Sequence, residues 1–259
     1  MQNPPKKFNW ILKIVFLSLT LAWTATAAGL DIQIGGDQSL EPSNLAVVHQ
    51  ETFDPGKDLG EIFWGVLDQK KENDPWTGLL GKRGYELINT GKPGAVRYYY
   101  RQQLDAQHSA TLSEQPLSVE VSGQFDGEIA GAGLLYAFDP DTKHYLAFVI
   151  GKGNSYAIYR KNQDGLRKIL GGKSTAIHPA PPDQLAITPQ GDTINFYING
   201  THIAKIKNES PPAGAAGIIA ISAGRFVFDN FTLYETPHAG QGPARQPAAD
   251  RSESPQAAE

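Results

Sequence analysis

An Asn-Gly pair between two runs of strand-forming residues restricts the fold of this chain more than any other feature. Thr193 to Ile198 and Thr201 to Ile206 flank Asn199-Gly200. Asn-Gly is the preferred centre of a two-residue hairpin turn, because both residues adopt positive φ at low cost. Apolar side chains recur at every second position of the first run, at Ile194, Phe196 and Ile198. This period predicts a strand with one buried face, paired with the following strand in an antiparallel hairpin.

The same pattern of short strands and turn residues repeats through much of the chain. Pro140 to Lys143 and Asp164-Gly165 are two further turn signals, since Pro, Asp and Gly each favour turn conformations. Strands are predicted on both sides of these turns and elsewhere, at 95–102, 117–125, 134–139, 144–150, 155–163, 166–170, 216–223 and 226–234. Long amphipathic helices are absent from the sequence, and only Ile62 to Lys71 is a weak candidate. We therefore predict an all-β fold, an antiparallel β-sandwich.

Composition limits the function classes. The 259 residues are 10% aromatic, enough for a packed core, so global disorder is excluded. The absence of Cys excludes disulfides, thiolate metal sites and a Cys nucleophile. A net charge of −4 argues against a nucleic-acid partner, because such proteins usually carry a basic surplus. Six His are scattered singly, without the spacing of a zinc site.

The N-terminus has the organisation of a secretory signal peptide. Lys6 and Lys7 precede an apolar stretch, and Ala25-Thr26-Ala27 matches the small-x-small cleavage pattern. We expect cleavage before Ala28, no membrane span afterwards, and an extracytoplasmic location, periplasmic or secreted. Residues 28–44 are predicted to be a linker, 45–235 one domain, and 236–259 a disordered tail rich in Pro and Ala. An uncleaved anchor is the alternative for residues 1–27, although the apolar run is short for a span.

Three segments of the domain resemble the concanavalin A-like lectin/glucanase superfamily, in its bacterial laminin-G-like jelly-roll branch. They are GLLYAFDPDTKHYLAFVI from Gly133, LAITPQGDTINFYINGTHIAKI from Leu185 and FVFDNFTLYE from Phe226. ETFD from Glu51 and GYELINTG from Gly84 look like the family's opening segments. The resemblance implies a jelly roll over about 51–235. It specifies function poorly, because these motifs mark turns and core positions.

Two groups of enzymes in this superfamily bear on catalysis. Its glycoside hydrolases commonly carry an E-x-D-x-x-E pattern, which places an acid and a nucleophile beside the glycosidic bond. That pattern does not occur around Glu120 or Glu128, and no Ser/His/Asp or Cys/His signature is present. The domain also distantly resembles 3-keto-disaccharide hydrolases, but no active-site residue of that family is transferred. No catalytic residue is predicted, and a sugar-acting enzyme of this kind remains the alternative.

The cluster Arg97-Tyr98-Tyr99-Tyr100-Arg101 is the strongest candidate for a binding surface. Alternation along a strand places Arg97, Tyr99 and Arg101 on one face. An aromatic ring between two guanidinium groups is suited to carbohydrate, because it supplies a stacking plate and planar donors. Trp64 and Trp76 are predicted to add further stacking surfaces. The alternative is that these aromatics fill the core of the sandwich while the Arg side chains face solvent.

Two short acidic segments are candidates for metal ligands or for structural features. Asp139 and Asp141 bracket Pro140 and could ligate calcium through their carboxylates, or simply cap the turn. No other cofactor is predicted. Asp229-Asn230 in the last strand is interpreted as a polar pair at a bulge or strand edge. The favoured function is an exported, noncatalytic module that binds carbohydrate or another envelope polymer, with a structural or protein-interaction domain as a further alternative.

Overall fold

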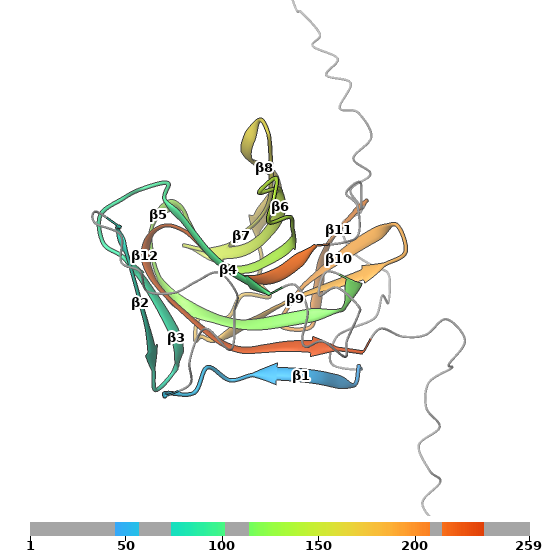
Figure 1. The fold of residues 1–259 in the computed structure, drawn as a ribbon, viewed down its shortest axis with the longest axis horizontal. Coiled ribbons are helices and arrows are strands. Elements are labelled where there is room, and N and C mark those ends of the chain that lie inside the picture. The colour runs from blue at the N-terminus through green and yellow to red at the C-terminus, as the bar shows by residue number, and fades with distance from the viewer. Residues whose placement is uncertain (1–44, 57–73, 102–113, 208–213, 236–259) are drawn as a thin grey trace, which may run out of the picture. The chain divides into compact units, whose positions relative to one another are not determined.

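The computed structural model describes residues 45–56, 74–101, 114–207 and 214–235, all in the unit spanning Asp31–Glu259 (Figure 1). The predicted signal peptide, linker, tail and 62–71 helix, and Trp64, lie outside these residues. The described part contains twelve strands: β1 Val47–Glu51, β2 Trp76–Gly81, β3 Gly84–Asn89, β4 Val96–Arg101, β5 Leu117–Phe138, β6 Tyr145–Gly151, β7 Ser155–Asn162, β8 Gly165–Lys173, β9 Asp183–Gln190, β10 Thr193–Ile198, β11 Thr201–Lys207 and β12 Ala215–Tyr234.

Two long strands, β5 and β12, belong to both layers of the fold. Every pairing among the described strands is antiparallel. The first layer has the order β11-β10-β9-β5-β12-β3-β2, and β1 pairs with the end of β12. The second layer runs β4-β12-β5-β6-β7-β8. The early part of β5 pairs with β9 and its later part with β6, while β12 meets β4 first and β3 afterwards.

Both long strands bend sharply where they pass from one layer to the other, on the left of Figure 1. Their pairing shifts register between Ile221 and Ala223, beside Ser222 with a φ of 70°. Gly224 has a φ of 153°, and a Cβ there would lie 2.5 Å from the Gln124 carbonyl oxygen. Such a bulge strengthens the local twist without ending the ladder. The predicted strands 117–125 and 134–139 are therefore parts of one strand, as are 216–223 and 226–234.

The bend is held by a polar corner between β3 and β12. The amide of Asn89, a fully buried residue, donates to the carbonyl of Ser222 at 2.9 Å and to that of Lys92 at 3.0 Å. The Ser222 backbone N–H donates to the carbonyl of Ala95, and its hydroxyl accepts from the N–H of Gly94. These bonds satisfy buried groups that would otherwise be costly.

The main core fills the space between the layers. Phe148 of β6 and Phe196 of β10, both fully buried, come from different layers and meet edge to face, with ring centroids 5.2 Å apart. Ile194, Phe196 and Ile198 all belong to this core, as their spacing predicts. The antiparallel all-β sandwich is thereby confirmed. However, Asn195 and Tyr197 on the other side of β10 are buried as well.

A second apolar cluster lies on the outer side of the second layer. It contains Leu135 and Phe138 of β5, Tyr145 of β6, and Ile219 and Ile221 of β12. Residues that alternate with these, such as Leu134 and Ile218, belong to the main core. Both faces of the second layer are therefore apolar, and the outer one is rich in tyrosine.

Candidate functional site

The alternation predicted for β4 is present, but the face that contains Tyr99 points into the sandwich. Tyr99 is 4% exposed, and its ring packs edge to face against Tyr85, with centroids 5.3 Å apart. The two hydroxyls are hydrogen-bonded at 2.8 Å. Both sides of the ring are thus occupied by protein, and we do not retain Tyr99 as a ligand contact. The alternative stated for this aromatic, a place in the core, is the one that the structure adopts.

The two arginines on this face of β4, Arg97 and Arg101, also lie among protein groups rather than on an open surface. Arg97 forms an ion pair with Asp74, the second residue before Trp76 of β2. Arg101 is half-buried, and its Nε is enclosed without a hydrogen-bond partner among the described residues. Trp76 is 5% exposed and packs against Phe226, so it belongs to the core too. The predicted set is therefore not brought together on an open surface.

The opposite side of β4 presents tyrosines toward the outside of the second layer. We use the name tyrosine face for Tyr98, Tyr100, Tyr145 and Tyr159. Ring centroids lie 4.9 Å apart for Tyr98 and Phe138, 4.4 Å for Tyr100 and Phe138, and 5.8 Å for Tyr98 and Tyr145. These separations are typical of packed aromatic pairs. Three of the tyrosines are half-buried and Tyr145 is 6% exposed.

The hydroxyl groups of the tyrosine face differ from that of Tyr99 in their surroundings. Among the described residues, none of the four hydroxyls has a hydrogen-bond partner, in contrast to the Tyr85–Tyr99 pair. Burial is the main cause that raises the pKa of Tyr145 to about 12, with repulsion from Tyr98 adding to it. Burial also raises the pKa of Tyr98 and Tyr159. All three therefore remain neutral donors at physiological pH.

Small and apolar residues separate the tyrosines across the sheet. One cross-strand row reads Tyr100, Gly217, Leu135, Ala147 and Tyr159. Four strand spacings of about 4.8 Å place its two tyrosines about 19 Å apart along the sheet. The neighbouring row reads Tyr98, Ile219, Gly133, Val149 and Ala157. Neither of these rows contains a carboxylate, which an acid–base mechanism would require.

The Asp139–Asp141 turn satisfies its own carboxylate. Asp139 accepts hydrogen bonds from the backbone N–H of Asp141 at 2.8 Å, the N–H of Thr142 at 3.3 Å and the Thr142 hydroxyl at 2.6 Å. The Thr142 hydroxyl is the main cause that lowers the pKa of Asp139. The described residues contain no group of three His, Cys, Asp or Glu placed to hold a metal ion. The geometry is that of a capped turn.

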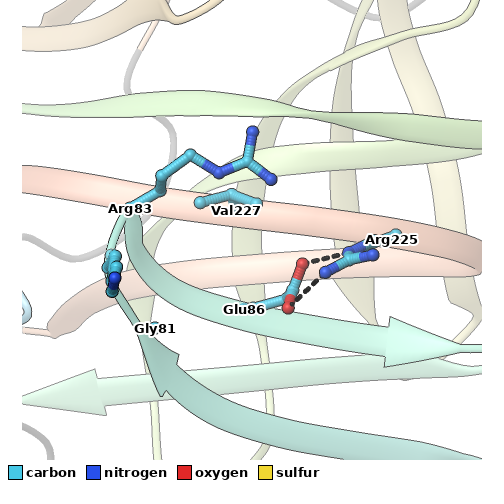
Figure 2. A pocket seen from close by; sticks show the side chains of 7 residues that line it. Gly81, Arg83, Glu86, Arg225 and Val227 are labelled. Carbon is cyan, nitrogen blue, oxygen red and sulfur yellow. Dashed lines mark hydrogen bonds and ion pairs between the residues drawn. The ribbon is translucent and has the colours of Figure 1, made fainter. Parts of the chain in front are cut away.

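A separate small cavity of about 190 Å³ lies on the outer side of the first layer (Figure 2). The turn between β2 and β3 forms one wall, with Lys82 and Arg83 at its tip. Glu86 of β3 and Arg225 of β12 form another, joined by a two-fold hydrogen-bonded ion pair. Nothing in the sequence pattern signalled this site, because Glu86 and Arg225 are 139 residues apart.

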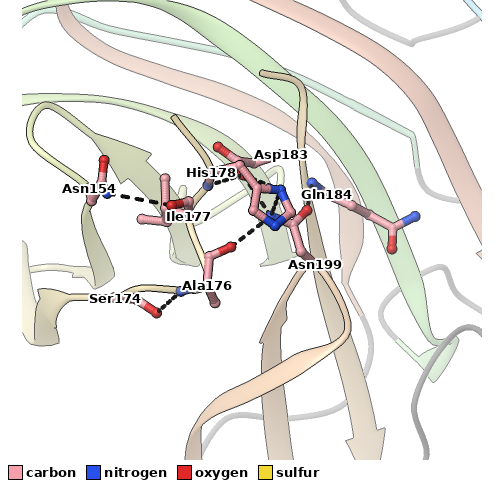
Figure 3. A network of polar contacts seen from close by, with 8 residues as sticks. All are labelled: Asn154, Ser174, Ala176, Ile177, His178, Asp183, Gln184 and Asn199. Atoms are coloured by element: carbon pink, nitrogen blue, oxygen red, sulfur yellow. Dashed lines mark hydrogen bonds and ion pairs between the residues drawn. The ribbon is translucent and has the colours of Figure 1, made fainter. Parts of the chain in front are cut away.

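A polar network centred on Asn199 has a structural role (Figure 3). Asn199 has the positive φ expected of a two-residue hairpin turn, 49°. Its amide donates to Asp183 at 2.6 Å and to the Ala176 carbonyl at 2.8 Å, and its side-chain oxygen accepts from the N–H of Gln184 at 2.7 Å. Asp183 also accepts from the backbone of His178 at 2.9 Å. The turn predicted from Asn-Gly thus also fixes the segment that leads into β9.

A group of carboxylates lies around the end of β12. Asp229 is directly opposite Glu120 of β5, and burial followed by repulsion from Glu120, Asp54 and Glu51 raises its pKa. A hydrogen bond from the N–H of Asn230 opposes this rise. Register shifts between Asp229 and Thr232, with Asn230 at a φ of 48°. The bulge interpretation of this pair is thus confirmed.

Comparisons with known proteins find similar solved structures but no family. No family model matches the chain, and no curated protein matches it. Similar solved structures include the carbohydrate binding module CBM66 from Bacillus subtilis, at 16% identity, covering 74% of this chain and 98% of that one, with a TM-score of 0.47. The Bacillus licheniformis β-glucanase is 10% identical, covers 73% and 98%, and has a TM-score of 0.48.

The laminarinase catalytic domain from Thermotoga maritima is 8% identical, covers 75% of this chain and 99% of that one, and has a TM-score of 0.47. At this similarity, no activity is transferred from these structures to this chain. Within the described residues, no helix has the length and apolar character needed to cross a bilayer.

Proposed function

We propose that this chain is an exported, noncatalytic module that binds carbohydrate on the tyrosine face. The observation that carries the proposal is the set of four tyrosines on one sheet face whose hydroxyls have no protein partner in the described part of the chain. A tyrosine hydroxyl in a packed environment normally has a hydrogen-bond partner. A polyhydroxylated ligand would supply such partners to several of these hydroxyls at once.

The chemistry of the face suits a sugar chain in two respects. The rings offer apolar surface to C–H groups, and the neutral phenols can both donate to and accept from ligand hydroxyls. The rings of Tyr98, Tyr100 and Tyr145 pack against Phe138, so ordering them on binding requires little loss of conformational freedom. The absence of carboxylates from its two central rows favours binding over hydrolysis.

This proposal moves the predicted site by one residue along β4. Tyr98 and Tyr100 replace Tyr99 as the aromatic contacts, and Arg97 and Trp76 are assigned to the fold. The ligand class proposed from the sequence, carbohydrate or another envelope polymer, is kept. An extracytoplasmic location fits such a ligand.

The test is a glycan-array screen of the full chain, followed by calorimetric titration with a glycan that the array identifies. Tyr100→Phe and Tyr159→Phe each remove one hydroxyl and keep the ring. A net hydrogen bond contributes about 0.5–1.5 kcal/mol, so each variant should bind about two- to twelvefold more weakly. Tyr156→Phe is the matched control, because Tyr156 packs against the main core from the other side of β7.

The control should bind like the wild type, and circular dichroism should show an unchanged fold in all variants. Unaltered affinity in both Tyr100→Phe and Tyr159→Phe would remove the tyrosine face from the binding site. Absence of any glycan ligand on the array would contradict the proposed function itself.

A further inference from the structure

The cavity beside the β2–β3 turn has an excess of positive charge. Three of its lining residues are cationic (Lys82, Arg83 and Arg225) and one, Glu86, is acidic. Asp229 lies two residues beyond Val227 on β12 but does not line the cavity. Including Asp229 still leaves one more cation than acid, although Glu120, Asp54 and Glu51 lie around Asp229 outside the lining. The positive excess is thus confined to the residues that line the cavity.

The acidic residue of the cavity is already fully engaged. Glu86 is 7% exposed, and its two oxygens accept from Nε and Nη2 of Arg225, the latter at 2.9 Å. This pair fixes the plane of the Arg225 guanidinium and leaves its Nη1 free to donate. The hydrogen bond and the charge of Glu86 also raise the pKa of Arg225. Glu86 therefore orients Arg225 and forms no hydrogen bond or ion pair with Lys82 or Arg83.

Lys82 and Arg83 have no hydrogen-bond or ion-pair partner among the described residues. Both are exposed, and Figure 2 shows the Arg83 side chain extending above Val227 on the side toward Arg225. A guanidinium is well suited to bind a carboxylate, sulfate or phosphate group, because its donors form a planar fork. Besides the guanidinium groups of Arg83 and Arg225, the Lys82 ammonium group can donate from a more flexible side chain.

The backbone holds the turn firmly against β12. Gly84 has a φ of 109°, and a Cβ at this position would lie 2.2 Å from the carbonyl oxygen of Phe228. Any other residue at position 84 would separate the two strands. The close approach sets the backbone position from which the Arg83 side chain extends along the cavity that Lys82 and Arg225 also line.

We propose that this cavity binds the oxyanion group of a small or polymeric anion, that is, a carboxylate, sulfate or phosphate. A volume of about 190 Å³ is below the ~300–1,000 Å³ of ordinary ligand pockets and suits one such group. The cavity lies outside the first layer, while the tyrosine face lies outside the second. The two sites are therefore independent, and failure of either leaves the other intact.

Titration of the full chain at low ionic strength, followed by backbone-amide NMR, tests the proposal. The probes are inorganic sulfate, inorganic phosphate and a galacturonate oligosaccharide. Shifts at the Gly84 amide report the site. Arg83→Ala should weaken binding of an effective probe about tenfold or more, and Arg83→Lys should weaken it less, because the charge remains while the fork is lost. Arg167→Ala is the matched control, an exposed arginine of β8 outside the cavity.

Binding of the inorganic ions alone would support a site for free anions, and stronger binding of the oligosaccharide would support a site for an acidic polymer. In both cases the Arg83 variants must lose affinity for the probe, while the Arg167→Ala control must keep it. Equal weakening by Arg83→Ala and Arg167→Ala would indicate only general charge attraction and overturn the proposal. Absence of shifts at Gly84 with every probe would overturn it as well.

Discussion

At the residue scale, Asp229 occupies a position where its own ionisation opposes folding. It is a direct cross-strand neighbour of Glu120, and like charges in such pairs are destabilising. Its pKa is raised, first by burial. The folded protein therefore holds this proton more tightly than the unfolded chain. Stability is lost as the pH rises from the ordinary carboxyl range through the raised pKa.

We expect Asp229→Asn to raise the melting temperature at pH 7 and to leave it unchanged near pH 3, where both states carry the proton. The Asn side chain can still accept from the N–H of Asn230 through its oxygen. Thermal unfolding followed by circular dichroism at the two pH values measures this. Asp126→Asn, an exposed carboxylate of β5, serves as the control and should change little. A lower melting temperature for Asp229→Asn at pH 7 would contradict the interpretation.

The β4 residues illustrate what a sequence can and cannot reveal about a site. Alternation correctly separates Tyr99 from Tyr98 and Tyr100. It does not tell which of the two sets faces the interior, because both faces of the second layer are apolar. That choice is made by Tyr85, which comes from another strand and binds the Tyr99 hydroxyl. The information lies in a tertiary contact, and no local pattern contains it.

At the scale of elements, the β10–β11 hairpin is the most predictable part of the fold. Its first strand, Thr193–Ile198, has the bounds that the sequence predicts, because Asn199-Gly200 specifies the turn chemically. The long strands β5 and β12 are the least predictable. Gly127 and Gly224 resemble strand breaks in the sequence, yet in the structure pairing continues through the bend. A glycine in the sequence does not show whether a strand ends there or continues through a bend.

Phe196 tests the contact between the layers. It is fully buried and packs edge to face on Phe148. We expect Phe196→Ala to lower the free energy of unfolding by ~3–5 kcal/mol, as is typical for a buried aromatic replaced by Ala. Urea denaturation provides the measurement, with Ile129→Ala as the control, because Ile129 is 53% exposed. Similar effects of the two substitutions would mean that Phe196 does not join the layers.

At the scale of the whole molecule, the sequence predicts processing that the described residues do not include. The signal pattern implies that the exported chain begins at Ala28 and lies outside the cytoplasm. Expression in a bacterial host, cell fractionation and N-terminal sequencing would establish this. Recovery of an exported protein that still contains Lys6 and Lys7 would contradict cleavage and favour the anchor. An Ala27→Arg variant is the control, and it should block processing at this position.

The sharing of β5 and β12 between the layers has a consequence for how the chain acquires its fold. Strand β12 supplies ladder partners to β1, β3, β4 and β5, and it is the last strand in the described part of the chain. Neither layer can close before this strand arrives, so native contacts join residues far apart in sequence and folding is expected to be slow. A chain still being synthesised, up to residue 214, lacks the strand that completes both sheets. Such a chain would remain unfolded, and an unfolded polypeptide can pass through a narrow translocation channel.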